Sequence, residues 1–167
     1  METVIFMVLL SWFIAGHGAA AASDAARLRI PNALIVYLLG GVMVAAVLSQ
    51  PGWAGLAAHA AVGLAILVGG LILFARGWMG GGDVKLLAVT GLWLGPAATP
   101  ALLILTALAG GVLTLAMIGL RFCGANRLVG GRIAALRDPM DRVPSGIAIA
   151  AAAIAVVILR PEALLMG

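Results

Sequence analysis

The sequence predicts an all-α, polytopic integral membrane protein with six transmembrane helices. Hydrophobic residues make up 64% of its 167 residues and charged residues only 10%, whereas a soluble domain carries about 25% charged residues. The mean hydropathy of +1.21 is too high for a surface that faces water. The apolar segments are long and lack the alternation of a β-barrel. Helices are therefore expected, because they satisfy their own backbone groups in lipid.

The first three hydrophobic segments are separated by turn-forming residues. The first, 4–22, is long enough to span a bilayer, and only Glu2 among the residues before it is charged. Because a signal peptide begins with a positive region, this segment is interpreted as a retained helix. Pro31 suits the first turn of the second helix, and Pro51 with Gly52 forms the turn before the third.

The last three segments are bounded in the same way. A glycine-rich loop, Gly80–Gly82, precedes the fourth segment, and Gly95 with Pro96 ends it. A polar stretch rich in arginine separates the fifth segment from the sixth. The sequence thus predicts a single domain, 1–167, with a cytoplasmic loop at 121–142 and helices at 4–22, 31–48, 53–74, 83–94, 98–120 and 143–159.

Basic residues orient this bundle. Two follow the first segment, two flank the loop after the third, and five follow the fifth: Arg27, Arg29, Arg76, Lys85, Arg121, Arg127, Arg132, Arg137 and Arg142. Only Arg160 falls on the other side. Because positive loops stay in the cytoplasm, both termini are expected in the periplasm. The net charge of +4 therefore reflects membrane orientation, and no nucleic-acid partner is expected.

The sequence predicts no metal site and no cofactor. The single cysteine, Cys123, permits neither an internal disulfide nor a cysteine-based zinc site. His17 and His59 are far apart and outside any metal-ligand pattern. Each is interpreted as a histidine tolerated within the membrane or at its surface.

Two of the six acidic residues need an explanation. Glu2 and Glu162 are near the termini. Asp138 and Asp141 lie among the arginines of the cytoplasmic loop. Asp24 follows the first predicted helix and Asp83 opens the fourth, so both are expected at the cytoplasmic boundary of the membrane. Asp83 also fits a simple N-cap and Asp24 an ordinary interfacial charge.

Two carboxylates at one depth of a small bundle can meet. Close together they share one proton, so that one acid is neutral while the other is ionised. The ionised group can then take a proton from an attacking water, and the neutral one can bond the developing oxyanion. The pair titrates as a unit, and neither role is assigned to one residue.

Three motifs in order carry a resemblance to a known family. Asp83 stands in the run Gly80-Gly81-Gly82-Asp83-Val84-Lys85-Leu86, and Asp24 precedes Ile30-Pro31-Asn32. Val143-Pro144-Ser145-Gly146 precedes the last helix. This set resembles the type IV prepilin peptidases, which are membrane aspartic proteases with a Gly-x-Gly-Asp motif. Ser145 stands where that family has an aromatic residue.

The resemblance implies an endopeptidase that removes the short leader of type IV prepilins or pseudopilins at the cytoplasmic boundary of the bacterial inner membrane. It implies catalysis by Asp24 and Asp83. It also implies supporting or substrate-binding roles for Gly80, Gly82, Lys85, Pro31, Asn32, Pro144 and Gly146. The chain lacks the cytoplasmic insert with paired cysteines of the bifunctional enzymes. It is similar to the short form of tight-adherence (Flp) pilus systems, and N-methyltransferase activity is not expected.

The neighbours of the two aspartates have alternative interpretations. The glycines before Asp83 are expected to form a turn, to permit unusual dihedrals and to let a substrate backbone approach. Lys85 is expected to point away from Asp83 and to contact lipid headgroups or hold the loop. Asn32 is expected to cap a helix or to hydrogen bond near Asp24. The loop 121–142 fits either a gate or a positive anchor.

Two other functions fit the same composition. A small transporter or ion-conducting subunit would use Asp24 and Asp83 as ion sites, with the carboxylates nearer the middle of the membrane. A pilus-assembly subunit would need neither residue for catalysis. The sequence predicts no particular oligomeric state.

Overall fold

The structure, a computed structural model, describes residues 2–122 and 144–165. All of its regular elements are helical, which confirms the predicted all-α class. The α-helices are α1 (Glu2–Arg27), α2 (Asn32–Ser49), α3 (Gly52–Ala75), α4 (Gly81–Phe122) and α7 (Ser145–Leu159), and a 3-10 helix, η1, covers Pro161–Leu165. Most of the predicted loop 121–142 lies outside the described residues.

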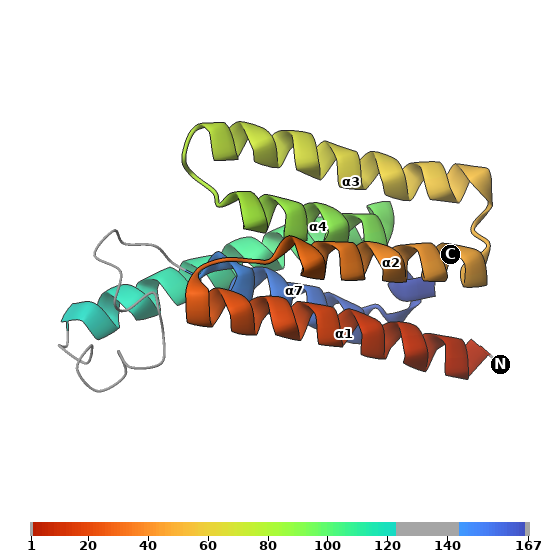
Figure 1. Cartoon of the computed structure of the whole chain (residues 1–167), viewed down its shortest axis with the longest axis horizontal. Coiled ribbons are helices and arrows are strands. Elements are labelled where there is room, and N and C mark those ends of the chain that lie inside the picture. Colours follow the sequence, from red (N-terminus) through yellow and green to blue (C-terminus); the bar gives the residue numbers. More distant parts are fainter. Residues whose placement is uncertain (1, 123–143, 166–167) are drawn as a thin grey trace.

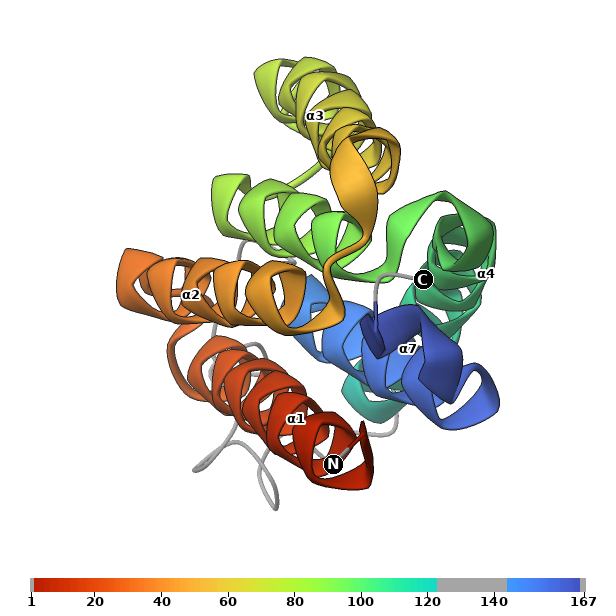
Figure 2. The same ribbon diagram turned by 90° about the vertical axis from the view of Figure 1, so that its right-hand side faces the viewer.

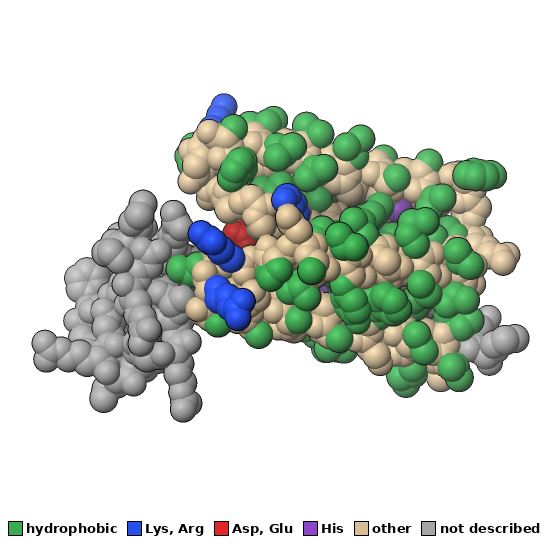
Figure 3. Space-filling view, viewed as in Figure 1, with side chains coloured by type: hydrophobic (Ala, Val, Ile, Leu, Met, Phe, Trp, Pro, Cys, Tyr) green, Lys and Arg blue, Asp and Glu red, His purple; other side chains and the backbone are tan. Residues whose placement is uncertain are grey.

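Four of these helices, α1 to α4, are long and apolar enough to cross a membrane, and α7 is a shorter apolar helix. Hydrophobic side chains are spread over the face of the bundle that Figure 3 shows. Leu64, Val112 and Leu115, for example, are more than half exposed. Such a surface suits lipid and not water. The chain is a multi-pass membrane protein, and the number of crossings stays a prediction.

Helices α1, α2 and α3 run alternately in opposite directions along the long axis of the bundle (Figure 1). Helix α7 packs between α1 and α4, and α3 lies on the outside against α4 (Figure 2). The end of α1, the start of α4 and the start of α7 therefore lie at one end of the bundle (Figure 1).

A core of large side chains joins α1, α2 and α4. Trp93 is fully buried and its indole N–H donates to the carbonyl of Leu38 at 2.9 Å. Its ring meets Phe13 edge to face, with centroids 5.4 Å apart. The glycines of α3 allow close contact on the other side, since a β-carbon on Gly70 would lie 2.6 Å from Val84. These contacts hold α4 in place between α2 and α3.

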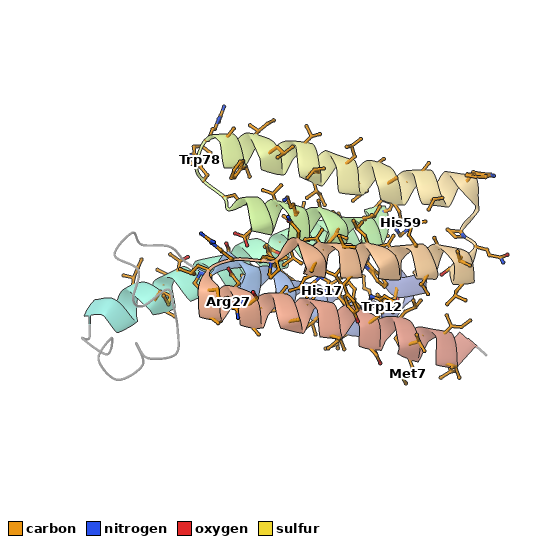
Figure 4. The ribbon with its side chains drawn as sticks, viewed as in Figure 1. Met7, Trp12, His17, Arg27, His59 and Trp78 are labelled. Atoms are coloured by element: carbon orange, nitrogen blue, oxygen red, sulfur yellow. The ribbon has the colours of Figure 1, made fainter. Side chains whose placement is uncertain are left out.

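Both histidines contribute to this packing. His17 is fully buried in the middle of α1 (Figure 4), with Nδ1 2.9 Å from the carbonyl of Phe13 and Nε2 2.8 Å from the hydroxyl of Thr90. It thereby links α1 to α4. His59 lies nearer the other end of the bundle, 7% exposed (Figure 4). Its partner is the carbonyl of Leu92 on α4.

Helix α4 bends sharply where the sequence predicts a helix end. Gly95 has φ 66° and ψ −172°, which divides α4 into residues 81–94 and 96–122. Because Pro96 has no N–H, it cannot donate to the carbonyl of Leu92 four residues earlier. His59 supplies that missing donor, because its Nδ1 lies 2.9 Å from this oxygen. A carbonyl only accepts, so the proton is on Nδ1.

Two further side chains satisfy carbonyls at the bend. The hydroxyl of Thr99 donates to the carbonyl of Gly95 at 2.7 Å, and the guanidinium of Arg160 donates to that of Ala97 at 3.2 Å. In lipid an unpaired carbonyl is costly, so these donors stabilise the bend. The bend returns the chain toward the end of the bundle where α4 began.

Replacing His59 by alanine is expected to destabilise the protein by about 1–3 kcal/mol, because the carbonyl of Leu92 is left without a donor. Thermal unfolding in detergent micelles measures this loss. Leu64→Ala, at an exposed position of the same helix, is the control and is expected to unfold close to the wild-type temperature. Equal unfolding temperatures for the two variants would contradict the role of His59.

Candidate active site

Asp24 lies inside α1 and not after it, which corrects the prediction from sequence. Helix α1 continues to Arg27 (Figure 4) because the alanines around the aspartate favour helix. Leu28 then takes φ 51°, and its N–H donates to the carbonyl of Asp24 at 2.8 Å. This closes the last turn of the helix. The side chain of Asp24 is consequently held by a helix and not by a loop.

The connection between α1 and α2 folds back onto this turn. The hydroxyl of Ser23 donates to the carbonyl of Arg29 at 2.8 Å. Pro31, with φ −62° and ψ 140°, is the N-cap of α2. Between them Ile30 faces the start of α4, where a β-carbon on Gly82 would lie 3.2 Å from the β-carbon of Ile30. The Ile-Pro-Asn motif thus joins the ends of α1, α2 and α4.

Asp83 is the third residue of α4, so it is not the N-cap itself. Its carboxylate turns back toward Gly80, which immediately precedes the helix. This is the reach of a third-position acid back to the cap residue. A β-carbon on Gly80 would lie 2.8 Å from Oδ2 of Asp83.

The glycines before Asp83 matter because they have no side chain, and not because they adopt unusual dihedral angles. Positive φ occurs at Gly77 and at none of the three glycines Gly80–Gly82, which corrects the expectation of unusual dihedrals there. Gly80 leaves room for the Asp83 carboxylate, and Gly82 leaves room for Ile30. The run permits close approach between the start of α4 and its neighbours.

The start of α7 joins the two aspartates. The hydroxyl of Ser145 donates to Oδ2 of Asp83 at 2.5 Å, and the N–H of Gly146 donates to Oδ2 of Asp24 at 2.7 Å. Both carboxyl groups are buried, with 5% of Asp24 and 8% of Asp83 exposed. Two consecutive residues of one helix therefore each hold one carboxyl group.

The electrostatics of this arrangement favour a shared proton. Asp24 and Asp83 are both buried and are held by consecutive residues of α7, and two like charges at close range in a buried site resist ionising together. The first N–H groups of α7 offset part of the negative charge, because a helix N-terminus is positive. A buried carboxyl pair of this kind can act as general base and general acid on one water molecule.

Packing around Gly146 leaves no room for a side chain. A β-carbon there would lie 2.8 Å from Oδ2 of Asp24 and 3.0 Å from Cδ1 of Ile30. Pro144 is the N-cap of α7, with φ −72° and ψ 78°. These two predicted supporting residues therefore set how closely α7 approaches α1.

Lys85 and Asn32 contact each other, and within the described residues neither hydrogen bonds to Asp24 or Asp83. The ammonium of Lys85 donates to Oδ1 of Asn32 at 3.0 Å, which links α4 to α2. Asn32 makes no side-chain cap on α2, whose N-cap is Pro31. Basic side chains gather around an acidic one at this end of the bundle (Figure 3).

The site residues predicted from the sequence include both aspartates and the glycines, but not two residues that contact them, Ser145 and Ile30. Ser145 was seen only as a departure from a family pattern, although its hydroxyl bonds Asp83. Its signal was a lone hydroxyl at the start of an alanine-rich apolar helix. Ile30 belongs to the Ile-Pro-Asn motif, but the motif alone does not indicate that its side chain lies between Gly82 and Gly146. Within the described residues, no group of three His, Cys, Asp or Glu could hold a metal ion.

Comparison with known proteins agrees with the resemblance in the motifs. A search of curated proteins and a search of solved structures found no significant match. The family model described as the type IV leader peptidase family matches residues 7–115, which include Asp24 and Asp83. Ser145 and Gly146 lie beyond the matched range. Since the match covers more than half of the chain, this multi-pass membrane protein belongs to the type IV leader peptidase family and is a protease of that kind.

Proposed function

We propose that the protein is an aspartic endopeptidase that removes the short leader of a prepilin or pseudopilin, with Asp24 and Asp83 as its catalytic pair. One observation carries the proposal most strongly. Ser145 bonds the carboxyl group of Asp83, and the adjacent Gly146 bonds that of Asp24. Two acids from helices that are far apart in the sequence therefore meet in a buried site. Family membership supports a peptidase acting on a prepilin-type substrate.

In the proposed mechanism a water molecule lies between the two carboxyl groups. The ionised carboxylate takes a proton from this water as its oxygen attacks the scissile carbonyl. The neutral carboxyl group hydrogen bonds the developing oxyanion, and a proton passes to the departing amine. The hydroxyl of Ser145 and the N–H of Gly146 orient the two groups, which reduces the reorganisation needed during the reaction.

The position of the pair fits a cut at a membrane boundary. The aspartates lie where α1 ends and α4 and α7 begin, and not at mid-bundle as an ion pathway would require. Basic residues of the described chain are close by at this end, and the positive-inside rule therefore supports a cytoplasmic orientation for it. The proposed location is therefore the bacterial inner membrane. The proposed activity is that of a peptidase without N-methyltransferase activity.

Asp24→Asn and Asp83→Asn are each expected to lower kcat for leader removal by at least about a hundredfold, because asparagine can neither accept nor deliver the catalytic proton. The assay is cleavage of a purified precursor in detergent or liposomes. Thermal unfolding of each variant shows whether it remains folded.

Glu162→Gln is the matched control, because Glu162 is an exposed acid in η1, away from the start of α7. It is expected to cleave at the wild-type rate. Normal cleavage by either folded aspartate variant would overturn the catalytic assignment and favour one of the non-enzymatic alternatives.

Ser145 is proposed as a positioning residue for Asp83. Ser145→Ala removes the 2.5 Å hydrogen bond to the carboxyl group and is expected to lower kcat about tenfold with KM unchanged. Ser145→Thr keeps the hydroxyl and is expected to restore most of the rate. If alanine and threonine give the same kcat, the hydroxyl does not position Asp83.

A further inference from the structure

A groove runs between the second half of α4 and α7 on the outside of the bundle. Its volume is about 500 Å³. Eleven residues line it and all are aliphatic: Leu105, Leu108, Ala109, Val112, Leu113, Ala116, Ile147, Ala148, Ala151, Ala152 and Ala155. We call this surface the α4–α7 groove.

The two walls of the α4–α7 groove differ. Helix α7 contributes mostly alanines, and Ala152 is only 2% exposed and forms part of the floor. Helix α4 contributes larger side chains at its rim, where Leu108 is 61% and Val112 is 68% exposed. A floor of small residues lets another backbone come close, and an apolar rim then packs against its sides.

One end of the α4–α7 groove lies one residue along α7 from the candidate active site. Ile147, at one end of the groove, directly follows Gly146, whose N–H bonds Asp24. From Ile147 the groove follows α7 to Ala155, which is about 12 Å along the helix axis. A segment lying in the groove would therefore have one end beside the carboxyl pair.

The chemistry of the lining selects the kind of occupant. A second groove, between α2, α3 and α4, has a volume of about 390 Å³ and includes the charged side chain of Lys85 in its lining. The α4–α7 groove has no polar or charged side chain in its lining. In lipid an apolar segment gains close van der Waals packing by lying in it, whereas a charged or polar segment would find no partners there.

We propose that the α4–α7 groove binds an apolar segment of the peptide substrate that adjoins the bond to be cut, so that this bond lies at Asp24 and Asp83. This inference rests on the proposed function. The groove positions the substrate by its apolar part, and the carboxyl pair acts on the backbone just beyond the end of the groove. Binding in the groove and catalysis at the pair are thus separate contributions.

The test fills the groove from either wall. Ala151 on α7 and Ala116 on α4 are both exposed lining residues, so Ala151→Trp and Ala116→Trp block the groove without entering the core. Ala107→Trp is the matched control, because Ala107 is exposed on α4 and is not a lining residue. Each purified variant is assayed on two substrates. One is a prepilin-type precursor with its apolar segment, and the other is a peptide that spans the cleavage point but lacks that segment.

For the precursor, both groove variants are expected to raise KM at least about tenfold, because the apolar segment can no longer pack closely against the floor of small residues. Their kcat at saturation, and their kcat/KM on the short peptide, are expected to equal those of wild type. The control is expected to match wild type on both substrates. Because the two variants alter different helices, either one that folds decides the result.

The outcomes separate the groove from the proposed function. If wild type cleaves the precursor and a folded groove variant has the same KM, the groove binds no part of the substrate and this inference is overturned. It is also overturned if the variants change only the oligomeric state or the amount of bound lipid, because the occupant is then a second copy or an acyl chain. Failure of the wild-type protein to cleave either substrate would instead overturn the proposed function.

Discussion

The start of α7 is the contact on which the site depends. Asp24 belongs to α1 and Asp83 to α4, and the hydrogen bonds that join them come from Gly146 and Ser145. Both carboxyl groups are buried, so each needs a donor to offset the loss of water. One helix end supplies both donors, with a backbone N–H for one acid and a hydroxyl for the other. The two acids are therefore held at one place only when α7 is packed between α1 and α4.

That packing depends on small residues and on one bend. Gly80, Gly82 and Gly146 leave the space in which Ile30 and the two carboxyl groups come together. The bend at Gly95 reverses the direction of α4, so its first half can place Asp83 beside the end of α1. Polar side chains satisfy the carbonyls that the bend exposes, with His59 replacing the donor that Pro96 lacks. In lipid, where water cannot take this role, such a bend is stable only with these partners.

The sequence predicted the elements of the site better than their contacts. The all-α class followed from composition, and the break at Gly95 followed from a glycine–proline pair. Both aspartates stood out because few acids occur in the chain. The role of Ser145 was not foreseen, because a serine beside a glycine has many local uses and only its distance to Asp83 identifies its partner. Lys85 and Asn32 were expected to support the aspartates, and their mutual bond joins α2 and α4.

The difference between what the sequence predicted and what it did not depends on whether a feature is local in the chain. Hydropathy, turn residues and the one-sided distribution of arginine and lysine are properties of short stretches, so the sequence by itself determined the helical membrane character and the candidate acids. The hydrogen bonds of the site join residues 62 and 122 positions apart. Whether such residues meet depends on how three helices pack to within tenths of an ångström, which the volumes of glycine, alanine and isoleucine at their contacts decide together. Only the tertiary structure could show that α7 holds both carboxyl groups.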